Sequence, residues 1–181
     1  MSKPWLTIVG LGEDGADGLS PASLKALREA AIVMGAKRHL GLLPELTAKL
    51  VEWPVPFSDG LPMLESFRGQ ETVVLASGDP FWHGAGGSIL GILDQKEWLA
   101  LPAVSSLSLG ASKLGWPLEK TPCLGLHAAP FGRLRPLLAD GQRIFCTVRD
   151  GAAVSDLGAW LDGARFGATE VHILEALGGP R

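Results

Sequence analysis

The sequence predicts an α/β protein made of two small α/β/α lobes with a cleft between them. Short apolar runs alternate with helix-like stretches, which is typical of βα units around a largely parallel sheet. Glycine-rich segments follow the first and third of these runs, as expected for loops at strand ends. The runs that we expect to be strands are residues 5–9, 32–34, 72–76, 101–104, 123–127, 143–148 and 171–174.

A junction between the lobes is predicted at residues 114–122, which read L-G-W-P-L-E-K-T-P. Two prolines, a glycine and a charged pair interrupt the alternation there. We therefore expect an N-terminal lobe at residues 1–115, which holds the glycine-rich loops, and a C-terminal lobe at residues 116–181. The closing E-A-L-G-G-P-R reads as a turn that leads into another element, so we expect the C-terminal lobe to be truncated.

The first expected helix has a well-marked start. Ser20 is a typical N-cap residue, and Pro21 fits the first helical position. Leu24, Leu27 and Ala31 then share one face at helical spacing. Two further helices are expected near residues 131–139 and 152–161.

Composition and charge exclude several classes of protein. Of the 181 residues, 46% are hydrophobic and 19% charged, which indicates a globular chain. The net charge of −3 argues against nucleic-acid binding through bulk charge. The longest uncharged run, residues 98–112, contains a proline and is too short to cross a bilayer, and no signal peptide precedes the first strand, so we expect a cytoplasmic protein. Cys123 and Cys146 form no C-x-x-C pair, so neither a disulfide scaffold nor a metal site is expected.

Three loops after strands predict a ligand site. Glycine-rich loops at residues 10–18 and 77–87 follow two of the expected strands, and Ser105-Ser106 ends a third. In parallel α/β sheets ligands bind outside the carboxyl ends of strands, where glycines let the main chain approach closely. In the second loop Asp79 is a hydrogen-bond acceptor followed by a stiffening proline, and Trp82 lies within the loop.

A dinucleotide site is the first alternative. Gly10, Gly12 and Gly15 match G-x-G-x-x-G, a motif that works only where a helix opens at once to hold the pyrophosphate. Here the helix signals come five residues after Gly15, and the usual acidic residue that would follow is replaced by Lys37-Arg38. Because two basic residues suit a 2′-phosphate, an NADP-dependent oxidoreductase stays an open hypothesis.

The three loops, taken in order, resemble the tetrapyrrole methylase family, the S-adenosylmethionine-dependent enzymes of corrin and sirohaem synthesis. The resemblance runs over essentially the whole chain. It implies methylation of a ring carbon, carbon 5, of a precorrin in cobalamin (vitamin B12) biosynthesis, with S-adenosylhomocysteine as the product. The stretches that carry it are I-V-G-L-G-E-D-G (8–15), M-G-A-K-R-H-L (34–40), S-G-D-P-F-W-H-G (77–84), P-A-V-S-S-L (102–107) and K-L-G-W-P (113–117).

The resemblance also implies a set of cofactor-binding residues, a homodimer, and a second methyltransferase domain fused to this one in the full-length protein. The family's L-H-G-R is replaced here by L-H-A-A at residues 126–129, so the role of its arginine is relocated or absent. The residues implied in S-adenosylmethionine binding are Gly12, Glu13, Gly78, Asp79, Trp82, Ser105, Ser106, Leu126 and Thr147.

Methyl transfer needs little from side chains, because the sulfonium is already activated and catalysis is mostly alignment of donor and acceptor. His127 is the candidate for proton handling, since histidine titrates near neutral pH. A precorrin carries many carboxylates, so a net-negative enzyme needs local positive charge, for which Lys37-Arg38-His39 and Arg133 with Arg135 are the obvious clusters. A non-catalytic tetrapyrrole-binding domain is the second alternative. The candidates for substrate binding are Lys37, Arg38, His83 and Arg133.

Overall fold

The computed structural model describes residues 3–180 and divides the chain into two compact units. The first comprises Met1–Ser106 and Ala176–Arg181, and the second Leu107–Glu175. Helix α5 (Ser106–Leu114) packs with the second unit, because a Cβ on its Gly110 would lie 3.2 Å from atoms of both Phe145 and Leu174. The predicted division after residue 115 and the cleft between the lobes stay predictions.

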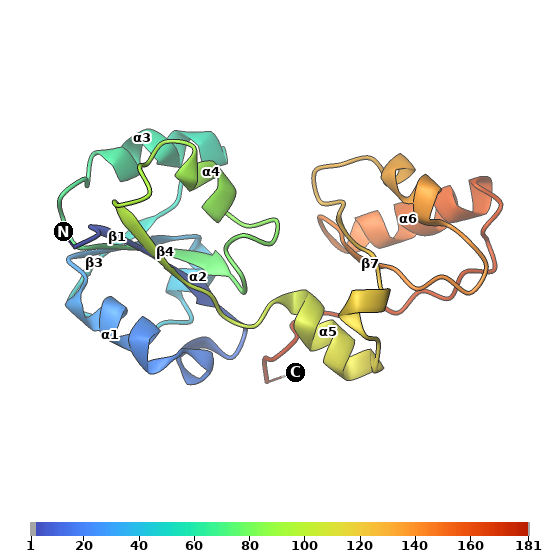
Figure 1. Cartoon of the computed structure of the whole chain (residues 1–181), viewed down its shortest axis with the longest axis horizontal. Coiled ribbons are helices and arrows are strands. Elements are labelled where there is room, and N and C mark those ends of the chain that lie inside the picture. Colours follow the sequence, from blue (N-terminus) through green and yellow to red (C-terminus); the bar gives the residue numbers. More distant parts are fainter. Residues whose placement is uncertain (1–2, 181) are drawn as a thin grey trace. The chain divides into compact units, whose positions relative to one another are not determined.

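The first unit is built on a parallel sheet (Figure 1). Its five strands pair in the order β3-β2-β4-β1-β5. Since every paired strand runs the same way, all five carboxyl ends lie at one edge of the sheet. The strands predicted at residues 5–9, 32–34 and 72–76 are confirmed as β1, β2 and β4. The strands are β1 (Leu6–Leu11), β2 (Ile32–Gly35), β3 (Lys49–Glu52), β4 (Thr72–Ser77) and β5 (Trp98–Leu101).

Two strands of this sheet differ from prediction. The strand expected at residues 101–104 lies at Trp98–Leu101 instead, because Pro102 has no N–H for the ladder and the residues after it leave the sheet. Strand β3 was not predicted. Its sequence K-L-V-E is short and half charged, which is common for an edge strand, and Leu50 there is 49% exposed.

Helices cover both faces of the sheet, α1 on one and α3 and α4 on the other (Figure 1). Helix α1 begins where predicted, since Ser20 is its N-cap and accepts a hydrogen bond from Ser23 N at 3.1 Å. The helices are α1 (Pro21–Glu29), α2 (Lys37–Leu40), α3 (Gly60–Glu65) and α4 (Gly86–Leu90), with short 3₁₀ helices at Gly15–Gly18 (η1) and Phe57–Asp59 (η2).

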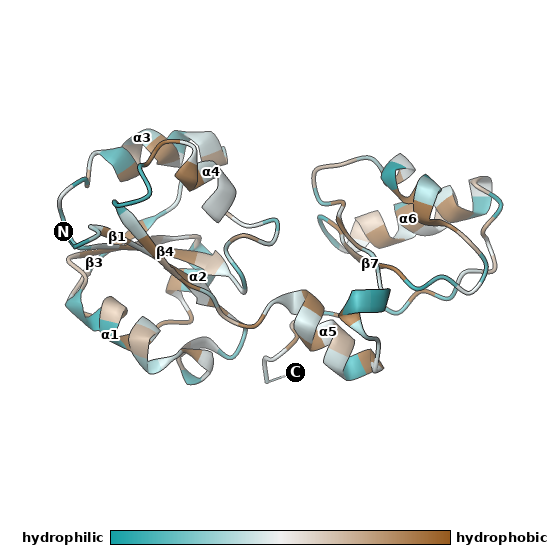
Figure 2. Ribbon diagram, viewed as in Figure 1, coloured by the Kyte–Doolittle hydropathy of each residue, from teal (hydrophilic) through white to brown (hydrophobic). Residues whose placement is uncertain are grey.

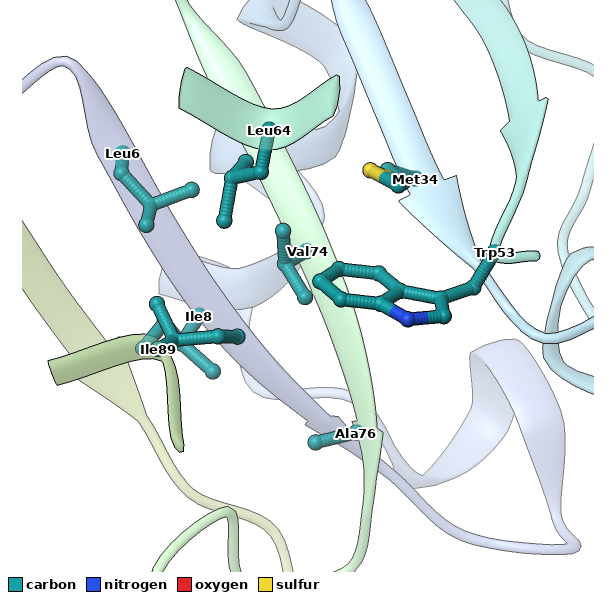
Figure 3. Packing of buried hydrophobic residues seen from close by; sticks show 8 residues of the cluster. All are labelled: Leu6, Ile8, Met34, Trp53, Leu64, Val74, Ala76 and Ile89. Atoms are coloured by element: carbon teal, nitrogen blue, oxygen red, sulfur yellow. The ribbon is translucent and has the colours of Figure 1, made fainter. Parts of the chain in front are cut away.

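The core follows from strand alternation, which turns successive side chains to opposite faces. Along β1 and β4, Ile8 and Val74 pack toward α3 and α4, in a cluster with Trp53 (Figure 3). Val9 and Val73 belong to the other cluster, which packs against α1. Because both faces are covered, the central strands are mostly hydrophobic, while the helices carry mixed faces (Figure 2).

The second unit has a two-stranded parallel sheet, β6 (Cys123–Gly125) with β7 (Phe145–Thr147), and the helix α6 (Gly151–Gly163). Its core contains Leu126, Leu134, Leu157 and Leu161. The helix α6 and both strands were predicted, but the strands are shorter than the predicted residues 123–127 and 143–148. One 3₁₀ helix, η3 (Leu118–Lys120), precedes β6, and another, η4 (Phe131–Leu137), lies between β6 and β7.

Of two further predictions for the second unit, the strand is wrong and the helix is confirmed in place but is of another type. No strand is assigned at residues 171–174, where Val171 and Ile173 are 45% and 68% exposed, so no buried face holds an alternating strand there. The helix expected near residues 131–139 is a 3₁₀ helix, because Pro136 inside it cannot donate an α-helical hydrogen bond.

Two findings bear on the expectations from composition. No helix within residues 3–180 is both long and apolar enough to cross a membrane. Cys123 and Cys146 are free thiols, and burial raises the pKa of each.

Replacing Gly10 by alanine is expected to destabilise the protein by about 1–3 kcal/mol, because the new Cβ would overlap the backbone of Gly78 and Ala103. Gly87→Ala is the matched control, since a Cβ there meets nothing within 4 Å and alanine favours the helix. Urea unfolding measures both. Equal stability of the two variants would show that the strand ends are not held together as described.

Candidate functional site

The loops after β1, β4 and β5 meet at the carboxyl edge of the first sheet. Gly78 N donates to Leu11 O at 2.9 Å, and Gly78 O accepts from Ala103 N at 3.1 Å. Gly78 has a φ of +53°, a conformation that favours glycine. A Cβ on Gly78 would lie 3.1 Å from Ser105 Cα, so the loop after β5 is drawn against this turn.

The loop after β4 folds into a rigid turn around Asp79. Asp79 Oδ1 accepts from Phe81 N at 2.9 Å, and Asp79 O accepts from Trp82 N at 3.1 Å. Trp82 is 39% exposed, and its ring contacts that of His83 with a centroid distance of 5.1 Å. His83 has a φ of +53°, an uncommon conformation for a side-chain-bearing residue that clusters at functional sites.

The loop after β1 does not have the geometry of a dinucleotide site. The 3₁₀ helix η1 follows Gly12 and Glu13, and α1 begins only at Pro21. The N–H groups that would hold a pyrophosphate at a helix N-terminus are therefore separated from the glycine motif. The loop is compact instead, because the Asp14 carboxylate fills the space beside Gly12 and Gly18.

A polar network links the ends of β1, β2 and β4 at the same edge. Arg38, in α2 directly after β2, forms an ion pair with Glu13 through Nη1. Its Nη2 donates to Ser77 Oγ at 3.1 Å and lies 3.1 Å from His39 Nε2. Ser77 Oγ and His39 Nε2 are 3.0 Å apart. The guanidinium is thus held from three sides.

His39 is the buried member of this network, at 7% exposure. Burial, followed by the charge of Arg38, lowers the pKa of His39 from 6.5 to about 4. The imidazole is therefore neutral at physiological pH. Its Nδ1 is buried and has no hydrogen-bond partner among the described residues.

The structure places most predicted residues of the first unit at this one edge. Gly12, Glu13, Gly78, Asp79 and Ser105 follow the ends of β1, β4 and β5, and Ser106 begins α5. Lys37 and Arg38 lie in α2, after β2. Ser77 was not predicted as a site residue, and His39 was predicted only as part of a positively charged cluster with Lys37 and Arg38, whereas its ring is buried and neutral. Their positions in the sequence were the available signal. Ser77 ends an apolar strand directly before Gly78, and His39 directly follows Lys37 and Arg38.

Three predicted residues of the second unit, Leu126, His127 and Thr147, lie at the carboxyl ends of β6 and β7. Leu126 N donates to Thr147 O at 2.7 Å, and Leu126 is buried. The Thr147 hydroxyl is buried with no hydrogen-bond partner among the described residues. An orphaned buried hydroxyl costs free energy unless a ligand or water satisfies it. His127 and Arg133 are exposed, the first after β6 and the second in η4.

A pocket of about 700 Å³ lies at the opposite, amino-terminal edge of the first sheet, away from the predicted residues. Lys3, Trp5, Arg68 and Glu97 are among its lining residues. Glu97 accepts from Trp5 Nε1 at 3.1 Å and pairs with Arg68 Nε at 2.9 Å. Lys3 is likewise paired within the protein, with Glu71 at 2.9 Å. Within residues 3–180 no group of three or more His, Cys, Asp and Glu could hold a metal ion.

Comparison with known families identifies the class. Residues 5–181 match the tetrapyrrole (corrin/porphyrin) methylases, and the chain belongs to this family. The resemblance seen in the sequence motifs is therefore confirmed, as is the α/β fold class.

Individual relatives narrow the comparison. A precorrin-6Y C(5,15)-methyltransferase (decarboxylating) from Sinorhizobium sp is 40% identical over 178 residues, 98% of this chain and 43% of that protein. A cobalt-precorrin-7 C(5)-methyltransferase from Salmonella typhimurium is 29% identical over 110 residues, 61% of this chain and 55% of that protein. The chain thus spans about half the length of these curated relatives.

A solved structure shares the fold. Uroporphyrin-III C-methyl transferase from Thermus thermophilus, complexed with S-adenosyl homocysteine, superposes with a TM-score of 0.63 and 23% sequence identity. The match covers 90% of this chain and 72% of that one.

The neutral state of His39 predicts an acid-labile contribution to stability. The unfolded chain binds this proton near pH 6.5 and the folded chain only near pH 4, so the unfolded state holds more protons in between. The stabilisation is complete above pH 6.5 and is lost as the pH falls toward 4. Between pH 7 and 4.5 the wild type should lose about 2 kcal/mol more than His39→Gln.

Urea unfolding of both proteins at the two pH values measures this difference. The variant serves as the control for carboxylates such as Asp150, whose lowered pKa also makes stability fall in acid. Equal losses in the two proteins would contradict the burial of a neutral His39.

Proposed function

We propose that this chain is an S-adenosylmethionine-dependent methyltransferase domain that methylates carbon 5 of a precorrin in cobalamin biosynthesis. Membership of the tetrapyrrole methylase family supports the reaction class. The two relatives act, by their names, at C(5,15) of precorrin-6Y and at C(5) of cobalt-precorrin-7. Carbon 5 is the position common to both names.

The observation that carries the proposal is the convergence of three strand ends through Gly78. The absence of side chains at Gly10 and Gly78 lets the backbones of three loops lie against one another, and exposes main-chain groups at the edge where parallel sheets bind ligands. We assign the cofactor to this edge, with Gly12, Asp79 and Ser105 around it. The product-bound uroporphyrin-III C-methyl transferase has the same fold, which supports this cofactor class.

The chemistry asks the protein mainly for alignment. S-adenosylmethionine, when bound, supplies a methyl group already activated by its sulfonium. The residues of this chain bind, orient and exclude water, which accounts for most of the acceleration in such a displacement. Trp82 offers a large half-exposed ring for packing, and His127 is our assignment for moving a proton.

Leu126 and Thr147 keep the cofactor-contacting role that the family resemblance implies. A ligand that accepts or donates at the Thr147 hydroxyl would relieve a buried group without a partner. For the substrate we assign Lys37, Arg38 and Arg133, with His83, to the carboxylates. Arginine holds a carboxylate with two parallel hydrogen bonds, which suits a polycarboxylate ring.

We further propose that the domain works as a homodimer in the cytoplasm. The homodimer rests on the family resemblance and the location on the expectation from the sequence, and sedimentation velocity of the purified chain tests the first. A second methyltransferase domain in the full-length protein stays a prediction.

Calorimetric titration with S-adenosylhomocysteine, with NADP run in parallel, tests the proposed function. Saturable binding of S-adenosylhomocysteine alone is expected, because α1 starts too far from the glycine motif to hold a pyrophosphate. NADP binding instead would favour the oxidoreductase. Binding of S-adenosylhomocysteine with no methyl transfer to a precorrin would indicate the non-catalytic domain, and binding of neither ligand would overturn the proposal.

Thr147→Val separates a ligand contact from a structural role. Valine removes the orphaned hydroxyl and suits a strand, so stability should be unchanged or rise. The affinity for S-adenosylhomocysteine should fall about 3- to 10-fold, the value of one hydrogen bond. Thr47→Val, at an exposed position outside the predicted site, is the control. Unchanged affinity in Thr147→Val would remove Thr147 from the site.

A further inference from the structure

The ion pair between Arg38 and Glu13 joins two residues for which the sequence predicts different ligands. Arg38 is a candidate for the substrate's carboxylates, and Glu13 lies in the loop assigned to the cofactor. The structure brings both to the same edge of the sheet, one after β2 and the other after β1. Within residues 3–180, Glu13 is the only carboxylate that forms an ion pair with Arg38.

The remaining contacts of Arg38 set its direction. Nη2 lies 3.1 Å from both Ser77 Oγ and His39 Nε2. A guanidinium only donates hydrogen bonds, so the nitrogen of His39 acts here as an acceptor. Because His39 is buried, its ring cannot swing away into solvent, and it holds one side of the guanidinium in place. The Nη1 side is left to face a carboxylate.

The ion pair is open to solvent, so replacing the Glu13 carboxylate by another carboxylate costs little free energy. The Arg38 side chain is 55% exposed and the Glu13 side chain 29%. Ion pairs of such exposure contribute little net free energy, since the charges are well solvated when apart. An incoming carboxylate that takes the same place keeps the charge of Arg38 balanced, and it returns the carboxylate of Glu13 to water.

We propose that, in the free protein, the Glu13 carboxylate occupies the position beside Arg38 that a carboxylate of the ligand takes on binding. Glu13 holds the guanidinium of Arg38 in one orientation at the strand ends. When a tetrapyrrole binds, one of its carboxylates displaces Glu13 from Arg38. Ser77 and His39 are the positioning residues that hold the guanidinium during the exchange. The identity of the ligand rests on the proposed function, whereas the exchange itself rests on the contacts of Arg38.

A double-mutant cycle with Glu13→Gln and Arg38→Gln tests the exchange. The probe is uroporphyrin III, a polycarboxylate tetrapyrrole whose fluorescence reports binding. Glu13→Gln should bind it about two- to fivefold more tightly than wild type, because the competing carboxylate is gone. Arg38→Gln should bind more weakly, and adding Glu13→Gln to Arg38→Gln should restore nothing.

Glu52→Gln is the matched control for charge alone, since Glu52 ends β3 at the same edge and is exposed. An equal rise of the affinity for uroporphyrin III in Glu52→Gln, or a rise on Glu13→Gln even when Arg38 is replaced, would mean that protein carboxylates repel the ligand in general. Either result would overturn the exchange. Weaker or absent porphyrin binding in Glu13→Gln would overturn it too, as would failure of the wild type to bind uroporphyrin III.

Titration of the same proteins with S-adenosylhomocysteine separates the two proposals. The affinity for S-adenosylhomocysteine should stay within twofold in Glu52→Gln, because Glu52 is exposed and has no assigned role in the site. If the wild type binds the porphyrin but not S-adenosylhomocysteine, the proposed function is contradicted. The double-mutant cycle with uroporphyrin III then still tests the carboxylate exchange. Loss of S-adenosylhomocysteine binding in Glu13→Gln, without tighter porphyrin binding, would place Glu13 in the cofactor site and overturn the exchange.

Discussion

The two backbone hydrogen bonds of Gly78 are the constraint on which the site depends. One joins the end of β4 to Leu11, and the other joins it to Ala103 after β5. Both are possible only because Gly78 adopts a left-handed conformation and Gly10 presents no side chain to the passing backbone. Three loops that come from distant parts of the chain therefore present main-chain groups at one place.

The sheet beneath can hold these loops because it is buried on both faces. Alternate residues of β1 and β4 pack into two separate clusters, one against α1 and the other against α3, α4 and Trp53. Trp53 is itself anchored, since its Nε1 donates to Phe57 O at 2.9 Å and its ring stacks on that of Phe57. A rigid platform of this kind allows loops to keep ligand-ready conformations.

Charge at the same edge is controlled by burial. A protonated His39 would place a second cation against Arg38 inside the protein, and its low pKa prevents this. The arginine therefore keeps one acceptor from a neutral ring, one from a hydroxyl and one from a carboxylate. Of these, the carboxylate of Glu13 is the acceptor that a ligand of the same chemistry can replace.

The sequence by itself determined the alternation of strands and helices, the cap of α1, the glycine loops and the family, because these depend on local propensity and on motifs within a few residues. It predicted Glu13 and Arg38 separately, and it missed β3, Ser77 and the burial of His39 as a neutral ring. Those depend on which strands become neighbours: β3 is an edge strand with little apolar pattern, and Ser77 meets His39 only because β2 lies beside β4. The pairing of Glu13 with Arg38 was likewise decided by the tertiary structure, since strand order, which local sequence does not encode, sets which loops share an edge.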